Sequence, residues 1–255
     1  KALDKYIPSP KVPPSLLHKA MRYSVFPGGK RIRAVLAIAS FEACGGKDNS
    51  ILPVASAIEL IHNYTLVHDD LPCMDNDDYR RGKLSCHKKF NEWAALLAGD
   101  ALLTLGFKLL SESGNINTIR DISEAAGSCG VIGGQVADIK KTRGNAKIDK
   151  KALDYITSHK TGFLFEAAMK AGGIFKGVNK KKIQSLGNFG RHIGFTFQLI
   201  DDLIDGDGYV KIYGADHLKK MARLLTERAK AELKEFGKKA DRLSAIADLI
   251  VERKA

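Results

Sequence analysis

Residues 52–70 have the sequence LPVASAIELIHNYTLVHDD, an apolar stretch that ends in two adjacent aspartates. Pro53 near its start, followed by apolar residues on every side of the helix, predicts a buried helix over Leu52–His68. A carboxylate at the end of such a helix is costly to bury unless it is solvated or bound to a cation. The stretch therefore predicts a helical core with a cation site at one end.

The same apolar pattern recurs along the chain and predicts further helices. Ala34–Cys44 is almost wholly apolar and closes on Gly45–Gly46, a helix-stop signal. Alternating strand patterns are almost absent, and the connecting stretches are short. We therefore predict an all-α fold, a single domain over residues 1–255 with about ten helices. The other predicted helices cover Glu92–Leu110, Glu124–Ile139, Leu153–Ala171, Ile183–Asp205, Met221–Phe236 and Ala240–Lys254.

The composition excludes several classes of protein. Apolar residues make up 44% of the chain and charged residues 27%, which argues against wholesale disorder. A net charge of +12 would suit a phosphate ligand, a nucleic acid or an anionic lipid. No helix-turn-helix, zinc-finger or RNP-like aromatic pattern accompanies this charge, so we do not expect a nucleic-acid partner.

Cysteine usage and hydropathy indicate the compartment. The four cysteines form no C-x-x-C pair, which argues against structural zinc and suits reduced thiols in the cytoplasm. No stretch has the ~18 uninterrupted apolar residues that span a bilayer. The best candidate, Ala94–Phe107, contains Asp100. With no signal-peptide pattern, we expect a cytoplasmic protein without a transmembrane segment.

Five aspartates lie within residues 69–78, directly after the buried helix. Because residues three and four apart share a helix face, Asp69 and Asp70 with an acid about one turn on would chelate a hard cation. Mg²⁺ takes oxygen ligands and is commonly held by one or two carboxylates together with substrate phosphates. A solvated acidic loop or a Ca²⁺ site is the alternative, but the glycine and terminal Glu of an EF-hand are missing.

A second acidic segment, FQLIDDLID, occupies residues 197–205. It places an Asp pair and a further Asp on an otherwise apolar helix, at Asp201, Asp202 and Asp205. One such segment is weak evidence, but two in one helical chain could face each other across a bundle and share a cluster of Mg²⁺ ions. The pair therefore predicts a polyanionic ligand.

Basic residues complete this prediction. Residues 28–33, GGKRIR, combine glycines that let backbone N–H groups approach a phosphate with a helix N-terminus that favours negative charge. Lys30 and Arg33 lie three apart and can point to one side. Arg80–Arg81 follow the first acidic run, and Lys160–Thr161 add a cation beside a hydroxyl. The spacing of a Walker A loop is absent.

Two other features are open to interpretation. His62 precedes Asp69 by two helical turns on the same face, so a diphosphate contact competes with an ordinary core role. Gly133-Gly134-Gln135 lies inside an apolar helical run and indicates close helix packing rather than catalysis. The role of Asp138 is left undecided.

Taken together, these segments resemble the trans-isoprenyl diphosphate synthases, the farnesyl and geranylgeranyl diphosphate synthase family. The resemblance runs from about Met21 to Gly214, and the joint occurrence of its motifs in this order is highly specific. The motifs are GGKRIR at 28–33, HDDLPCMDNDDYRRGK at 68–83, AGDALL at 98–103, GGQ at 133–135, HKTG at 159–162 and FQLIDDLID at 197–205.

The resemblance implies an all-α bundle around a deep central cavity, normally a homodimer, with three Mg²⁺ ions per active site once substrate is bound. It assigns metal binding to Asp69, Asp70, Asp75, Asp201, Asp202 and Asp205. It assigns the allylic diphosphate to Arg80, Lys160, Thr161 and Gln198. It assigns isopentenyl diphosphate to Lys30, Arg33, His62 and Arg81.

The implied reaction is ionisation of the allylic diphosphate, attack by the isopentenyl double bond and loss of a proton. The resemblance implies these catalytic residues: Asp69, Asp70, Asp75, Arg80, Lys160, Asp201 and Asp202. The sequence departs from the family after Asp205. Family members have a longer loop there with a further lysine on the diphosphate, and we do not assign that lysine to Lys211.

The length of the product is predicted from the residues below the first aspartates. Tyr64 lies ~7.5 Å before them along the helix, where a ring would act as a floor, and Thr65 beside it is small. An aromatic at this position, with the insertion Pro72–Cys73, resembles bacterial farnesyl diphosphate synthases. We predict a C15 product, with a C20 geranylgeranyl diphosphate as the alternative.

Three other classes remain as alternatives. A terpene cyclase would have an Asn/Ser/Glu second metal motif and no use for the KR-x-R pocket. A non-catalytic synthase subunit tends to lose the acidic motifs, and both are intact here. A nucleic-acid binder would show salt-sensitive binding to an oligonucleotide without magnesium-dependent diphosphate release.

Overall fold

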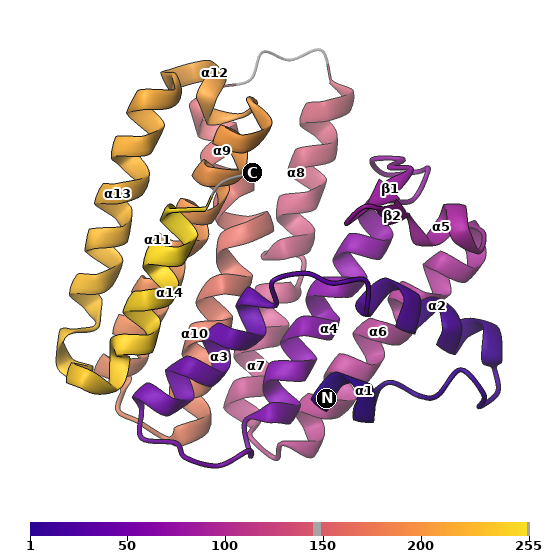
Figure 1. Ribbon diagram of the computed structural model, residues 1–255, viewed down its shortest axis with the longest axis horizontal. Coiled ribbons are helices and arrows are strands. Elements are labelled where there is room, and N and C mark those ends of the chain that lie inside the picture. Colours follow the sequence, from indigo (N-terminus) through magenta and orange to yellow (C-terminus); the bar gives the residue numbers. More distant parts are fainter. Residues whose placement is uncertain (145–148, 254–255) are drawn as a thin grey trace. The chain divides into compact units, whose positions relative to one another are not determined.

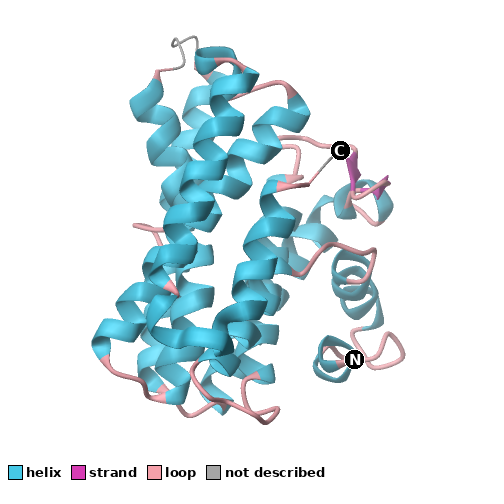
Figure 2. Cartoon of the chain, turned by 60° about the vertical axis from the view of Figure 1, so that its left-hand side comes forward, coloured by secondary structure: helices cyan, strands magenta, loops and turns pink. Residues whose placement is uncertain are grey.

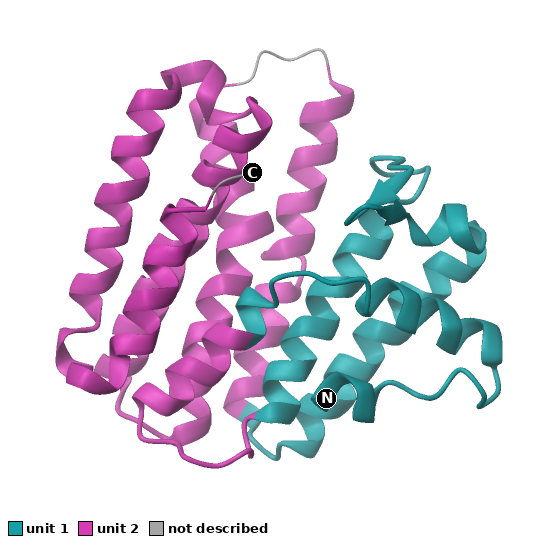
Figure 3. Cartoon of the chain, viewed as in Figure 1, with its two compact units in different colours: residues 1–34, 52–116 teal, residues 35–51, 117–255 magenta. Residues whose placement is uncertain are grey.

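The computed structural model describes residues 1–144 and 149–253, and most of them are helical (Figure 1; Figure 2). The predicted all-α class is confirmed. Within the described residues, strands occur in one short antiparallel hairpin, β1 (Tyr79–Arg80) with β2 (Lys83–Leu84). The chain divides into two compact units, residues 1–34 with 52–116 and residues 35–51 with 117–255 (Figure 3).

Unit 1 is built around α4 and α6, which pack along each other, while α2 lies against both. Two glycines of α6 make this approach possible. A Cβ on Gly99 would lie 2.1 Å from the His68 ring, and one on Gly106 would lie 2.9 Å from Ile61. The helices of this unit are α1 (Ala2–Tyr6), α2 (Ser15–Val25), the first residues of α3 (Ile32–Ala43), α4 (Leu52–Asp69), α5 (Cys86–Lys89) and α6 (Glu92–Glu112).

The helix α6 has a mean hydropathy of 1.5 over an 18-residue window and is long enough to cross a membrane. Its residues Ala94, Ala98 and Leu102 are nevertheless buried in unit 1, as in the core helix of a globular protein. Trp93, Leu96 and Leu97 lie at its exposed surface. Length and composition alone therefore do not make α6 a membrane span.

In unit 2, α11 packs against both α10 and α13, and α8 packs against a π-helix that precedes α10. The elements of this unit after α3 are α7 (Ile116–Ala126), α8 (Val131–Arg143), α9 (Lys150–Ile156), the π-helix η1 (Thr157–Gly162), α10 (Phe163–Lys176), α11 (Lys180–Asp205), α12 (Tyr209–Tyr213), α13 (Ala215–Glu232), the 3₁₀-helix η2 (Lys234–Ala240) and α14 (Asp241–Val251).

Several predicted helices are divided in the structure. The predicted helix Glu124–Ile139 breaks between α7 and α8, where a Cβ on Gly130 would lie 2.0 Å from the Ala125 carbonyl oxygen. The predicted helix Leu153–Ala171 contains the π-helical turn η1. The last predicted helix, Ala240–Lys254, begins one residue later at Asp241, and its final residue lies outside the described residues.

The contact of α10 with the unit 2 part of α3 gives a test of packing. A Cβ on Gly172 would lie 2.0 Å from Ser40 Oγ and 2.4 Å from the Phe41 backbone nitrogen, neither of which can retreat easily. We expect Gly172→Ala to lower the free energy of unfolding by about 1–3 kcal/mol in urea melts. Gly187→Ala is the matched control, because its new Cβ meets mainly the flexible Lys170 side chain. Equal stability of the two variants would contradict the packing argument.

Candidate active site

The first acidic segment lies where α4 ends. Asp69 and Asp70 are buried, at 9% and 2% exposure. The backbone then turns back, because the Asp75 N–H donates to the Asp69 carbonyl at 2.9 Å and the Asn76 N–H donates to the Leu71 carbonyl at 3.1 Å. Asp75 therefore returns to the helix end through a turn, and the expectation that it lies one turn further along the helix face was wrong.

Arg80 of β1 neutralises the buried carboxylate of Asp70. Its Nε donates to Asp70 Oδ1 at 2.8 Å, its Nη2 donates to the same oxygen, and Nη2 also donates to Asp77 Oδ2 at 2.8 Å. Burial nevertheless raises the pKa of Asp70, against the lowering effect of Arg80. The Arg80 side chain remains 35% exposed, so a second anion can reach it.

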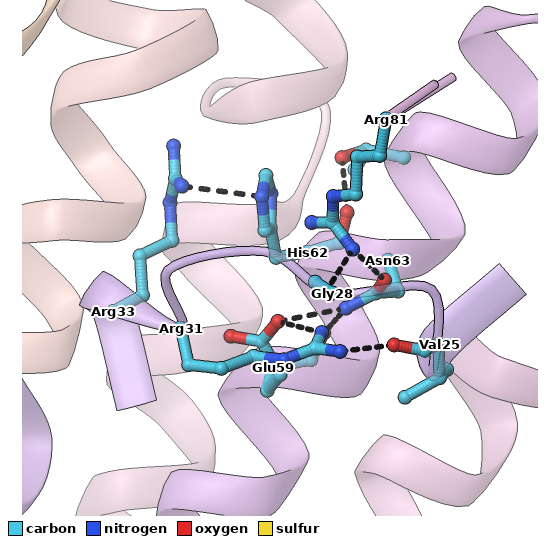
Figure 4. A network of polar contacts seen from close by, with 9 residues as sticks. Val25, Gly28, Arg31, Arg33, Glu59, His62, Asn63 and Arg81 are labelled. Carbon is cyan, nitrogen blue, oxygen red and sulfur yellow. Dashed lines mark hydrogen bonds and ion pairs between the residues drawn. The ribbon is translucent and has the colours of Figure 1, made fainter. Parts of the chain in front are cut away.

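Three of the four residues assigned to isopentenyl diphosphate come together in unit 1 from separate segments (Figure 4). Arg33 Nη1 donates to His62 Nε2 at 3.3 Å. Arg81 Nη1 donates to the Gly28 carbonyl at 3.1 Å. Lys30, the fourth residue, is exposed on the loop between α2 and α3. A Cβ on Gly29 would lie 2.6 Å from the Arg81 guanidinium, so the second glycine of GGKRIR makes room for this side chain.

These groups form a buried region of positive charge. Burial lowers the pKa of Arg33 to about 10, which still leaves the guanidinium charged at neutral pH. The pKa of His62 is lowered well below 6.5 by burial and then by Arg33 and Arg81. A guanidinium can only donate, so His62 Nε2 accepts and the proton of the neutral ring lies on Nδ1. The region therefore suits an anion with several oxygen acceptors.

Tyr64 and Thr65 lie on α4 between this basic region and the aspartates. Tyr64 is 6% exposed, and its ring meets the His68 ring edge-on at 5.7 Å between centroids. The hydroxyl of Thr65 donates to the His62 carbonyl at 2.8 Å. The Tyr64 ring is therefore fixed by its neighbours.

In unit 2, the π-helix η1 presents Lys160 and Thr161. Lys160 Nζ donates to Asp138 Oδ2 of α8 at 2.8 Å. A Cβ on Gly134 would lie 2.2 Å from the Lys160 backbone nitrogen, so the second glycine of GGQ allows α8 and η1 to pack closely. Single π-turns occur frequently at functional sites, because they alter the direction of side chains within a helix.

The second acidic segment ends α11 and is linked to η1 through Gln198. Thr161 Oγ1 donates to Gln198 Oε1 at 3.1 Å, and Gln198 Nε2 donates to Asp202 Oδ1 at 2.9 Å. The Tyr209 N–H donates to Asp202 Oδ2 at 2.7 Å. Burial raises the pKa of Asp202, against the lowering effect of these two donors. A Cβ on Gly208 would lie 2.2 Å from this carboxylate, so the turn after Asp205 needs glycine there.

The other two aspartates of this segment are more accessible. Asp201 forms an ion pair with Arg253, whose guanidinium also lies 4.7 Å from the centre of the Phe197 ring. Asp205 is exposed at the end of α11. Lys211 Nζ pairs with Asp207 Oδ1 at 2.8 Å, and Asp207 lies in the turn after Asp205.

The donor chemistry of both segments fits Mg²⁺, because each offers carboxylate oxygens at a helix end. Among the described residues, no group of three or more His, Cys, Asp or Glu side chains is assembled as a complete metal cage. Mg²⁺ needs no such cage, since it keeps several waters and shares substrate phosphates. Asp69, Asp70 and Asp75 in unit 1 and Asp201, Asp202 and Asp205 in unit 2 are the residues that would hold it.

Sequence reasoning missed several polar side chains beside these sites. Glu59 and Asn63 of α4 are each 1% exposed and bond to Arg31 and Arg81 (Figure 4). Asp138, left undecided, holds Lys160. A polar residue within an apolar helix is a signal that a buried partner exists, but the sequence does not identify that partner.

Comparison with known proteins identifies a family. A family model described as polyprenyl synthetase matches residues 14–232. The chain is 38% identical over 280 residues to the chloroplastic geranylgeranyl pyrophosphate synthase of Capsicum annuum, covering 99% of this chain and 75% of that protein. It is also 38% identical over 276 residues to the farnesyl diphosphate synthase of Micrococcus luteus, covering 98% and 92%.

Solved structures agree with this match. The apo crystal structure of an FPP/GFPP synthase from Zymomonas mobilis has a TM-score of 0.93 and 38% identity, and the alignment covers 98% of this chain and 93% of that one. That protein is named for two products, FPP and GFPP. The similar proteins therefore agree in fold and reaction class but differ in product.

The lowered pKa of His62 predicts a pH dependence of stability. Since the folded pKa lies below the ordinary 6.5, the unfolded chain binds the proton first as pH falls, and stability is lost below about pH 6.5. For each pH unit between the unfolded and the folded pKa of His62, the free energy of unfolding should fall by up to about 1.4 kcal/mol. Urea melts at pH 7.5 and 5.5 should show a smaller loss for His62→Asn than for the unaltered chain. An equal loss would contradict a buried neutral imidazole.

Proposed function

Because the chain belongs to the polyprenyl synthetase family and is a prenyltransferase acting on prenyl diphosphates, we propose that it joins isopentenyl diphosphate to dimethylallyl or geranyl diphosphate to make farnesyl diphosphate, C15. The observation that supports the C15 product most directly is the buried Tyr64 ring on α4, fixed against His68 before the first aspartates.

Binding of the allylic substrate is proposed for the side chains beside the two acidic segments. Arg80 and Lys160 each hold a carboxylate partner at 2.8 Å and carry a charge that a diphosphate can share. Thr161 and Gln198 add a hydroxyl and an amide. Bound Mg²⁺ would supply Lewis-acid stabilisation of the negative charge that develops on the departing diphosphate. The aspartates are assigned to hold it, as the resemblance implies.

Binding of isopentenyl diphosphate is proposed for Lys30, Arg33, His62 and Arg81. Three of these cluster within unit 1, and the neutral His62 ring leaves Nδ1–H as a donor. A second diphosphate pocket is what distinguishes a condensing enzyme from a terpene cyclase. The basic cluster therefore favours condensation.

The chemistry conserves atoms and charge. The allylic C–O bond breaks and diphosphate leaves with the bonding electron pair. The isopentenyl double bond attacks the resulting allylic cation to form the new C–C bond. Loss of a proton, to the released diphosphate as the nearest base, restores a double bond. Donors such as Arg80 and Lys160 would stabilise the leaving group as its charge develops.

A C20 product, geranylgeranyl diphosphate, is the second candidate. The favouring observation is the 38% identity to the Capsicum annuum enzyme, which is named for that product. The Micrococcus luteus relative is named for C15 at the same identity, so similarity does not decide between the two products. Both acidic segments are present, which disfavours a non-catalytic subunit.

The proposal also includes a homodimeric state and a cytoplasmic location. The exposed apolar residues Trp93, Leu96 and Leu97 of α6 form a face suited to a homodimer, and sedimentation should then give a dimer mass. A cytoplasmic location stays a prediction from the sequence. The chloroplastic Capsicum annuum relative shows that members of the family work in other compartments.

Magnesium dependence can be tested on the reaction itself. Incubation with isopentenyl and geranyl diphosphates should give a condensation product with Mg²⁺ and none with EDTA. Asp70→Asn should lower the rate by about 10³-fold, because it removes a proposed ligand and the partner of Arg80. Asp78→Asn is the control, since Asp78 lies in the same acidic run but pairs with Lys88 at the surface. No condensation product from the unaltered chain would refute the proposed function.

Product length can be tested at Tyr64. Replacement by Ala removes the ring that we propose as the floor ~7.5 Å from the aspartates and should shift the main product from C15 to C20 or longer. Tyr64→Phe keeps the ring and should keep C15. Chain lengths are compared after dephosphorylation by chromatography. An unchanged C15 product from Tyr64→Ala would remove Tyr64 from this role.

A further inference from the structure

A buried carboxylate lies beneath the basic cluster of unit 1. Glu59 of α4 is 1% exposed, and it precedes His62 and Asn63 by three and four residues, on the same helix face. Its Oε1 accepts from Arg31 Nη1 at 2.6 Å and from Asn63 Nδ2 at 2.9 Å (Figure 4). None of these three residues belongs to the proposed substrate contacts.

Arg31 fastens the loop that leads from α2 to α3. Besides Glu59, its guanidinium donates through Nη2 to the Val25 carbonyl at the end of α2. Its backbone has a φ of +52°, an uncommon conformation for a residue with a side chain. Lys30 precedes Arg31 on this loop, and Arg33 lies two residues on, in the first turn of α3. The bond to Glu59 therefore fixes the segment that presents both cations.

Asn63 extends the network to Arg81. Its Nδ2 also donates to the Glu59 carbonyl at 2.7 Å, which fixes the amide orientation and turns Oδ1 towards Arg81 Nη1 at 3.4 Å. The same Nη1 donates to the Gly28 carbonyl on the loop at 3.1 Å. The contacts thus run from the loop through Arg31, Glu59, Asn63 and Arg81 back to the loop.

We infer that Glu59 is a positioning residue for the isopentenyl diphosphate pocket. It acts through Arg31 on Lys30 of the loop and Arg33 at the start of α3, and through Asn63 on Arg81. The inference rests on the proposed function only for the identity of the anion. Glu59 itself does not touch the substrate, because its carboxylate is buried and bonded within the protein.

The negative charge of Glu59 makes its positioning role testable. Three guanidinium groups, of Arg31, Arg33 and Arg81, lie around one carboxylate (Figure 4). By Coulomb's law alone, a carboxylate near an anion site weakens anion binding, and its removal should strengthen binding. If Glu59 instead holds the cations in place, its removal weakens binding although the pocket becomes more positive.

The experiment compares two variants for which electrostatics alone predicts tighter anion binding in one and unchanged binding in the other. Glu59→Gln removes the negative charge at constant volume, and Arg31→Lys keeps the positive charge but loses the planar fork that reaches both Glu59 and Val25. We expect each to raise the KM for isopentenyl diphosphate by about tenfold or more, with the KM for geranyl diphosphate and kcat within about twofold of the unaltered chain. Glu166→Gln is the matched control, since Glu166 is a largely buried glutamate of α10 that pairs with Arg191 at 3.3 Å.

Calorimetric titration of the metal-free protein with isopentenyl diphosphate and with inorganic pyrophosphate separates this inference from the proposed function. Weaker binding to both variants, with native circular dichroism and an unaltered Glu166→Gln, supports the inference. Binding to Glu59→Gln that is unchanged or tighter, or unchanged binding to Arg31→Lys, would overturn it and leave the proposed function standing. Absence of condensation by the unaltered chain would overturn the proposed function, while the titration still decides the role of Glu59.

Discussion

Charge buried on an apolar helix is the constraint on which the structure of unit 1 depends. The helix α4 contains Glu59 and ends at Asp69 and Asp70, and unpaired ions at such positions would cost several kcal/mol. Glu59 and Asp70 each recruit an arginine from outside the helix, Arg31 for Glu59 and Arg80 for Asp70. These pairs attach the loop before α3 and the β1–β2 hairpin to α4. The ion pairs that complete the fold therefore also bring together the cations that a diphosphate needs.

Much of the fold could be predicted because buried helices leave an apolar pattern in the sequence. The helix predicted over Leu52–His68 ends one residue later, at Asp69. Local sequence did not predict the break at Gly130 or the π-turn at Thr157–Gly162. Gly130 is required by the approach of the Ala125 carbonyl, and η1 is packed against α8 through Gly134. The π-turn thus depends on a neighbour that is distant in the sequence, whereas the break at Gly130 is a local turn, and apolar periodicity reveals neither.

The candidate site was predictable in its residue types and less so in its geometry. The motifs identified Asp75 as a partner of Asp69, but a helix-face argument placed it wrongly, because backbone hydrogen bonds of the turn return it to the helix end. Arg33 and His62 are 29 residues apart in the sequence, and only family resemblance associated them. Glu59 was not identified, because a lone acid in an apolar stretch has no visible partner until the loop that carries Arg31 folds onto it.

The two acidic segments hold their central carboxylates in physically different ways. Asp70 is paired with a charged and partly exposed guanidinium, whereas Asp202 accepts from two neutral donors, the Gln198 amide and the Tyr209 backbone. A cation bound at Asp70, as proposed, would compete with Arg80, and the displaced guanidinium would then be available to the proposed diphosphate. A cation near Asp202 would not have to displace a charged group from the Gln198 amide or the Tyr209 N–H, although Asp201 beside it pairs with Arg253. If the first segment binds Mg²⁺ as proposed, occupation of that site is therefore coupled to the release of Arg80, a proposed diphosphate contact.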